Sequence, residues 1–314
     1  MANPTYKDLQ LVDEALSGLA VRYTNTLPLV WRDVFTVVPV SKTSVTYPVY
    51  DKSDLLRIEA QESEFGSDPV FMDYRVTRQA ATIREYKLAK SHSYKDVKNQ
   101  ADSFDIEADA VVILTDQVTR RVEKAAADAT MVTGKWGVDL STPPGGTWES
   151  GGTPRKDVID LMNTFAKDNG VMPNIIILGA KVFDKLRTNT DIVGALATNR
   201  DQVVTETLLK ELWFSDNPGR VLVPRAVYDT SNEKITSSAT GAYIWKEDAF
   251  FMGYISEIPT TERPTAQVAL LLEDILVRRW ELEARRSFAI EASMGVAFKT
   301  TATDLGVYID QAVI

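Results

Sequence analysis

The sequence predicts an α+β protein in which a long β-hairpin and a long helix precede a separate α/β unit. Alternating strand patterns run from Val34 to Lys90 around a single glycine, Gly66. Apolar residues at spacings of three and four then predict one amphipathic helix over Asp105–Met131. Helices and strands alternate over 156–258, before a strand-rich return over Gln267–Lys299.

The composition is typical of a folded protein and excludes any chemistry that depends on cysteine. Of its 314 residues, 44% are apolar and 25% are charged, with a net charge of −9 and no cysteine. The absence of cysteine excludes disulfides and thiolate metal sites, and the negative balance argues against a protein that grips nucleic acid through many phosphates. No apolar run is long enough to span a membrane, and the first residues do not resemble a signal peptide.

The segment from Val34 to Lys90 is expected to form one continuous hairpin. In its first arm, Val45, Tyr47 and Val49 alternate with polar residues, and Pro48 favours a two-stranded ribbon over a central strand. At roughly 3.3 Å per residue, an arm of about 20 residues reaches up to roughly 65 Å. A compact chain of this length has a radius of gyration of only about 20 Å. We therefore expect the hairpin to lie on a neighbouring copy of the chain.

Two groups of residues are candidates for contacts between copies. The first group surrounds the hairpin tip and continues into the return arm: Glu62, Glu64, Phe65, Gly66, Asp68, Tyr74 and Arg75. The second group lies on one face of an expected strand, where it predicts a charge ladder suited to cross-strand pairing: Arg279, Glu281, Glu283 and Arg285.

The helix over Asp105–Met131 has acidic residues at its start and basic residues further along, which suits the helix dipole. Its narrow apolar stripe predicts that it lies across a sheet. A glycine- and proline-rich loop over 134–156 then indicates a domain boundary. Beyond it, helices are expected over 157–169, 180–187 and 203–213, and strands over 174–179, 221–228, 241–245 and 249–255.

Known catalytic patterns are absent from the sequence. His92 is the only histidine, and its polar surroundings predict an exposed residue with a structural role. No phosphate-binding glycine motif or calcium loop occurs, so no cofactor and no metal are expected. The carboxylate pairs at the tip and in the ladder are better explained as charged surfaces than as glycosidase acids. Lys87 and Lys90 could serve a covalent crosslink between copies, but the sequence gives no partner for them.

Taken in order, these segments resemble the major capsid proteins of tailed phages with the HK97 fold. The resemblance rests on VFTVVPVSKTSVTYPVYDKSDLLRIEA (34–60), EYKLAKSHSYKDVKNQADSFDIEADA (85–110) and PNIIILGAKVFDKLR (173–187). It implies an N-terminal arm (1–33), an extended loop (34–92), a peripheral domain with a spine helix (93–155), an axial domain (156–258), return strands of the peripheral domain (259–300) and a C-terminal segment in the axial domain (301–314).

The resemblance also implies a function and partners. Copies would assemble as pentamers and hexamers into an icosahedral shell around double-stranded DNA, in the virion and, during assembly, in the host cytoplasm. Because the chain starts almost directly at the arm, a separate scaffolding protein is expected, with a portal and a decoration protein as further partners; no membrane is expected. The alternatives are an encapsulin-type shell, an enzyme built on 156–258, and a tail or tube protein.

Overall fold

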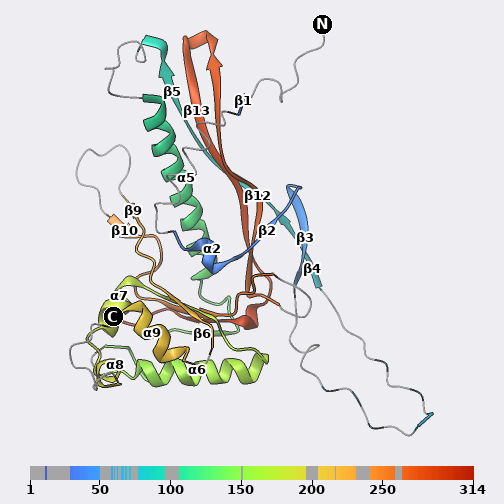
Figure 1. Cartoon of the computed structure of the whole chain (residues 1–314), viewed down its shortest axis with the longest axis vertical. Helices are drawn as coiled ribbons and strands as arrows, with labels where there is room; N and C mark the ends of the chain where they lie inside the picture. Colours follow the sequence, from blue (N-terminus) through green and yellow to red (C-terminus); the bar gives the residue numbers. More distant parts are fainter. Residues whose placement is uncertain are drawn as a thin grey trace.

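The structure is a computed structural model that describes residues 11–12, 29–49, 58, 60, 62, 65–66, 68, 71, 77–95, 106–149, 151–195, 204–215, 217–230, 241–258 and 264–314. These residues form an elongated sheet with a long helix beside it, and a compact second domain at one end of the sheet (Figure 1).

The elongated sheet is built around two long antiparallel strands. β12 (Gln267–Leu282) and β13 (Ser287–Thr300) pair along most of their length, and β5 (Arg84–Ser93) extends the sheet beyond β13. On the other side of β12, β1 (Leu11–Val12) pairs antiparallel and β2 (Thr36–Pro39) pairs parallel, at different points along the strand. The strand order is therefore β1-β12-β13-β5, with β2 also on β12.

The long helix α5 (Ile106–Thr130) lies along this sheet, against β13 and β5. Val111, Val118 and Val122 are among its buried side chains, so the expected narrow apolar stripe does face a sheet. The helix ends just before Gly134, whose φ of 77° suits a residue without a Cβ.

The prediction of one continuous hairpin over Val34–Lys90 is wrong. Among the residues that the structure describes, hairpin pairing within this segment is limited to β3 (Ser44–Val49), which runs antiparallel to β4 (Thr77–Thr82). The outer parts, β2 and β5, lie on opposite sides of β12 and β13 and do not pair with each other. Alternation in a sequence predicts that a segment forms a strand but does not predict which strand it pairs with. Here β2 pairs with the apolar strand β12, and β5 pairs with the apolar strand β13.

The second domain is organised around a sheet with the order β6-β14-β11-β7-β8. The apolar run of β7 is buried at every residue, as a strand covered on both faces requires. Gly170 follows the last residue of the helix over 154–169 and adopts the left-handed conformation expected of a C-terminal cap. The strands are β6 (Val138–Leu140), β7 (Ile175–Leu178), β8 (Arg220–Leu222), β11 (Phe250–Gly253) and β14 (Gly306–Ile309). The helices are α6 (Pro154–Asn169), α7 (Ala180–Leu186), α8 (Thr190–Ala195) and α9 (Glu206–Trp213).

Several details of the second domain differ from the expectation. The loop over 134–156 contains β6, so the second sheet includes residues ahead of the boundary placed at 156. The strand expected over 221–228 is divided between β8 and β9 (Val227–Asp229), and β9 pairs with β10 (Gly241–Tyr243) in a separate hairpin. The C-terminal segment returns to this sheet, where β14 pairs with β11.

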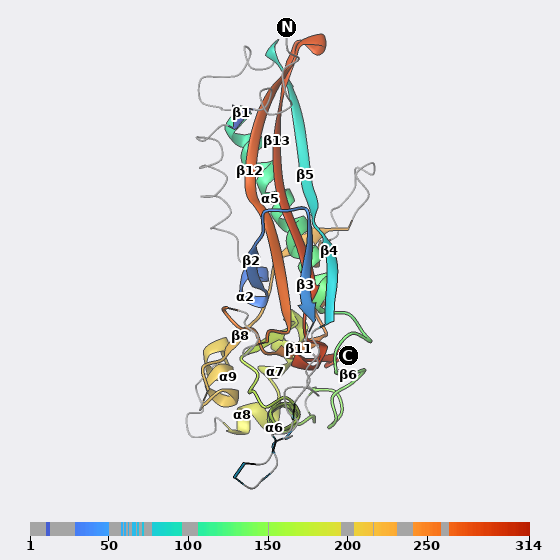
Figure 2. The same ribbon diagram turned by 90° about the vertical axis from the view of Figure 1, so that its right-hand side faces the viewer.

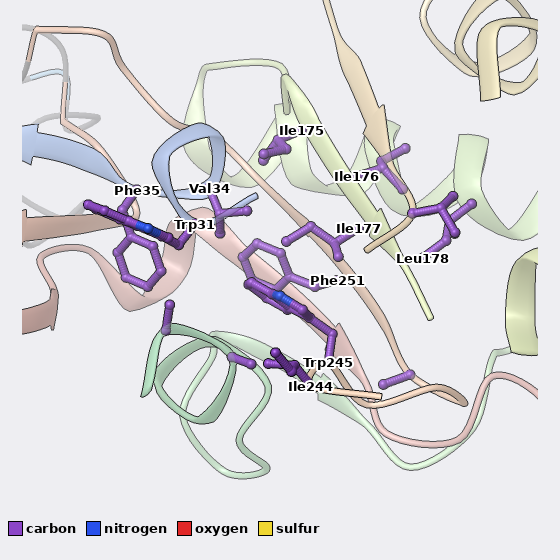
Figure 3. Packing of buried hydrophobic residues seen from close by; sticks show 14 of the residues in the cluster. Trp31, Val34, Phe35, Ile175, Ile176, Ile177, Leu178, Ile244, Trp245 and Phe251 are labelled. Carbon is purple, nitrogen blue, oxygen red and sulfur yellow. The ribbon is translucent and has the colours of Figure 1, made fainter. Parts of the chain in front are cut away.

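The two parts share one apolar core at their junction. The short helix α2 (Trp31–Val34) places Trp31 and Phe35 against Phe298, with ring centroids 5.7 Å and 4.7 Å apart. Figure 3 shows Trp31 and Phe35 in one apolar cluster with Trp245 and the isoleucines of β7 from the second domain. Packing of this kind fixes the orientation of the elongated sheet relative to the second domain.

Candidate assembly surfaces

The β3–β4 hairpin is fixed to the elongated sheet at its base. Tyr47 and Ala81 pack with Ile83, Val268 and Leu270 in a small apolar cluster of their own. The hydroxyl of Tyr47 donates a hydrogen bond to Gln79 Oε1 at 2.9 Å, and burial raises the pKa of this hydroxyl. β3 ends and β4 begins on the side of the second domain (Figure 2).

The connection carries apolar side chains that the rest of the described chain leaves uncovered. Phe65 is fully exposed, and Ile58 and Phe71 are 92% and 89% exposed. Scattered exposed apolar residues are ordinary, but three large ones on one connection indicate a surface made for contact. Ile58 and Phe71 were not among the predicted contact residues. Ile58 stands between two charged residues, Arg57 and Glu59, which is a signal that could have found it, whereas Phe71 stands between Val70 and Met72 and carries no such signal.

Those predicted contact residues of the tip that the structure describes are all exposed to solvent. Glu62, Phe65, Gly66 and Asp68 are exposed, and Gly66 has a φ of 94°, which favours glycine in a turn. The remaining predicted residues of this group, Glu64, Tyr74 and Arg75, lie outside the described residues.

The predicted charge ladder of Arg279, Glu281, Glu283 and Arg285 is not formed. β12 ends at Leu282, and Glu283–Arg285 form a short 3-10 turn. Across the strand pair Arg279 faces Ile290 and Glu281 faces Phe288, so neither of these two residues faces an opposite charge on β13. The alternation of charged residues extends beyond the end of β12 into the turn. It was mistaken for strand alternation because charged residues are common in exposed turns as well as on exposed strand faces.

The charged groups at this end of the sheet have other partners. The guanidinium of Arg279 lies 4.4 Å from the centroid of the Phe288 ring and 3.5 Å from Glu107 of α5. Partial burial and a hydrogen bond with Glu281 raise the pKa of the Tyr94 hydroxyl. Arg285 is exposed at the tip of the β12–β13 hairpin. The structure therefore brings Arg279 and Glu281 into one cluster and leaves Glu283 and Arg285 on the turn.

The expectation of an exposed His92 is also wrong, because the side chain is only 5% exposed. Its ring stacks on Phe288 at a centroid distance of 5.8 Å, and its backbone pairs with that residue in the sheet. The polar neighbours in the sequence point away from the position that His92 itself occupies, since successive residues of a strand face opposite sides.

The described residues contain neither a metal-binding cluster nor a membrane-spanning helix. No group of three or more acidic or histidine side chains there is arranged to hold a metal ion. Within the same residues, no helix has the length and apolar character needed to cross a membrane.

Comparison with known proteins identifies the architecture. No protein-family model matches the chain. The major capsid protein of Burkholderia phage BcepMu is 22% identical over 242 residues, covering 73% of each chain. A solved structure of a phage-related protein from Bordetella bronchiseptica RB50 is 19% identical, with a TM-score of 0.74 over 97% of this chain and 99% of its own. The chain has the HK97-like capsid fold.

Other structures with the HK97-like fold come from shells of different kinds. The capsid of a native GTA particle has a TM-score of 0.55 and 16% identity, over 100% of this chain and 96% of its own. The SrpI encapsulin of Synechococcus elongatus PCC 7942 has a TM-score of 0.57 and 10% identity, over 100% of this chain and 94% of its own. The fold resemblance noted from the sequence is thereby confirmed.

Proposed function

We propose that this chain is a major capsid protein, whose copies assemble as pentamers and hexamers into an icosahedral shell around double-stranded phage DNA. The observation that carries the proposal is the apolar set Ile58, Phe65 and Phe71, exposed on a connection whose base is fixed to the sheet. The HK97-like fold and the phage capsid relative support the same reading.

The energetics favour a contact that acts repeatedly across a shell. Covering one of these side chains with a neighbour contributes about 1.5–3 kcal/mol. The tip of one copy and the surface that receives it are different surfaces, so the contact is head-to-tail and closes into rings when the rotation permits. Repetition around a ring then multiplies a modest single contact.

Within this proposal the segments have the roles expected from the resemblance, adjusted to the strands as they pair. Residues 34–92 form the extended loop together with its two attachments to the sheet, β2 and β5. The spine helix is α5, with 93–155 and 259–300 in the peripheral domain. The axial domain is 156–258 with the C-terminal segment 301–314, and β6 joins it.

The partners follow from the same proposal. A separate scaffolding protein, a portal and a decoration protein would act with the shell, in the host cytoplasm during assembly and in the virion afterwards. DNA would be enclosed without sequence-specific contacts, in keeping with the net charge of −9. The role of the chain is structural, not enzymatic.

An encapsulin-type shell is the second candidate, because the fold similarity to an encapsulin is as high as that to the GTA capsid. The two candidates differ in what the particle contains. Purified particles that hold double-stranded DNA support the phage capsid, whereas particles that hold an enzyme bound through a short peptide support the encapsulin.

The proposal is tested by replacing the exposed apolar residues with serine, as Ile58→Ser, Phe65→Ser and Phe71→Ser together. Because these side chains touch little else in the subunit, the melting temperature of the unassembled subunit should change by less than about 2 °C, and assembly measured by sedimentation should be lost. Ile258→Ser, at a residue that is 73% exposed but lies in the second domain, is the matched control and should still assemble. Normal assembly of the triple variant would contradict the proposed contact.

A further inference from the structure

A buried carboxylate joins three separate parts of the chain. Glu123 of α5 is completely buried. Its Oε1 accepts hydrogen bonds from the backbone N–H of Val30 at 3.1 Å and the indole N–H of Trp245 at 2.5 Å. Its Oε2 accepts a third from the backbone N–H of Trp31 at 3.3 Å. Residues 30 and 31 lead through α2 into β2, whereas Trp245 belongs to the second domain.

The carboxylate has no cation beside it. Buried carboxylates usually require one, but no cationic side chain of the described residues forms an ion pair with Glu123. The nearby basic residues that form ion pairs do so with other carboxylates: Arg32 with Asp274, Arg220 with Asp33, Lys246 with Asp310, Lys124 with Asp128 and Arg120 with Asp116. The negative charge of Glu123 is therefore stabilised by N–H groups alone.

Burial raises the pKa of Glu123, and the charge of Asp33 raises it further, while the three N–H donors oppose the rise. Asp33 is the titratable group of α2 that faces this site. The charged residues of β13 and β5, the strands that pack on α5, are Glu291, Lys299, Arg84, Glu85, Lys87 and Lys90. The folded chain thus takes up a proton at Glu123 at a higher pH than an exposed glutamate does.

Protonation changes the hydrogen bonds unequally. A charged carboxylate accepts on both oxygens, but a neutral one carries an O–H that must donate. Because Oε1 already receives two N–H donors, the proton is best placed on Oε2, where it faces the N–H of Trp31. The neutral form thereby keeps the bonds to Val30 and Trp245 and loses the one to Trp31.

We propose that Glu123 is a positioning residue that sets the start of β2 against the second domain, and that its proton controls how tightly residue 31 is held. The residues that follow are held by bonds of their own, which do not involve Glu123. Gln267 donates to the carbonyl of Val34 at 3.1 Å, and the hydroxyl of Thr36 donates to the carbonyl of Ser256 at 2.5 Å. The loosening should therefore be greatest at residue 31, just ahead of the strand that leads to the β3–β4 hairpin.

The test is amide hydrogen exchange of the full chain, with protection factors of residues 30–35 measured across pH and corrected for the intrinsic rate. In the wild type, protection at Trp31 should rise with pH as Glu123 loses its proton. Glu123→Gln copies the neutral form, so its protection at Trp31 should be about tenfold lower at neutral pH and independent of pH. Asp128→Asn, on the exposed side of the same helix, should behave as the wild type.

A second variant tests the proposal even if Glu123→Gln does not fold. Trp245→Phe removes one N–H donor to the charged form and keeps most of the packing, so the midpoint of the protection curve should move to higher pH. A midpoint that does not move in Trp245→Phe would overturn the proposal, as would wild-type pH dependence at Trp31 in a folded Glu123→Gln variant.

Discussion

Arg286 occupies a backbone conformation that favours glycine, with φ 46° and ψ 49° at the end of the turn between β12 and β13. Among the described residues other than glycine, Arg286 alone has a positive φ. A side chain in this region of φ and ψ costs roughly 1–2 kcal/mol. The guanidinium is exposed, so contacts within the described subunit do not explain why arginine stands here.

Arg286→Gly should therefore stabilise the subunit by about 0.5–1 kcal/mol, since glycine adopts this conformation without strain. Chemical denaturation of the unassembled subunit measures the effect. Arg285→Gly is the matched control, because Arg285 lies in the same turn with negative φ and its replacement should cost up to about 1 kcal/mol. Equal losses in both variants would show that the conformation of Arg286 carries no strain.

Lys135 is a second residue in an unusual environment. Burial and the nearby charge of Lys299 lower its pKa to about 8. Its ammonium group donates to the carbonyl of Ala129 and lies 4.9 Å from the centroid of the Trp136 ring. Because the folded pKa is lower than that of the unfolded chain, the unfolded chain binds more protons at this site between about pH 8 and 10.5.

The stability of the wild type relative to Lys135→Met should therefore rise as the pH increases from about 8 to 10.5. Below that range the difference should be constant, since the residue is protonated in both states. Urea unfolding of the two proteins at a series of pH values measures the difference and cancels the titration of other groups. A difference that falls with pH would contradict the lowered pKa.

At the scale of the elements, the end of the β12–β13 hairpin depends on Glu281 more than on Glu283. Glu281 is hydrogen-bonded to Tyr94 and lies on the same strand as Arg279, whereas Glu283 is in the exposed turn. Glu281→Lys should lower the stability of the subunit by about 1 kcal/mol, and Glu283→Lys should change it by less than about 0.5 kcal/mol. Thermal unfolding distinguishes the two, and a larger loss at Glu283 would favour the charge ladder that the sequence predicted.

Local patterns predicted the elements better than their partners. The helix over Ile106–Thr130 and the buried strand Ile175–Leu178 were found because apolar spacing and β-branched runs depend only on nearby residues. The partners of β2 and β5 were missed because pairing depends on which distant strands are more apolar. β6 was missed because three residues among glycines and prolines carry no periodic signal.

The candidate site was predictable only in part. Phe65 and Gly66 were identified from the glycine turn at the tip, and both are exposed. Glu123 could not be found from the sequence, because it is a charged residue on a helix whose partners lie about a hundred positions away in the chain. The burial of His92 was missed because its sequence neighbours are polar and only the strand geometry turns it inward.

At the scale of the whole molecule, assembly and subunit folding should separate. Deleting Gln61–Val70 removes the tip but not the apolar cluster at the base of the hairpin, which involves Tyr47 and Ala81. The deletion variant should therefore fold with a near-normal melting temperature and fail to form shells. Stable, normal particles from this variant would show that the tip does not hold copies together.

The shape of the molecule supports such a separation. The second domain and the turn between β12 and β13 lie at opposite ends of the elongated sheet, and the β3–β4 hairpin stands beside it (Figures 1 and 2). An elongated subunit exposes more surface for its volume than a compact one, and contacts between copies recover part of the lost burial. Stability of the assembled form should therefore depend on protein concentration.

Negative-stain electron microscopy of the purified full chain tests the central claim most directly. The account predicts closed particles of uniform diameter, built from rings of five and six copies. Rods, open sheets or a solution of monomers at the concentrations used for assembly would contradict it.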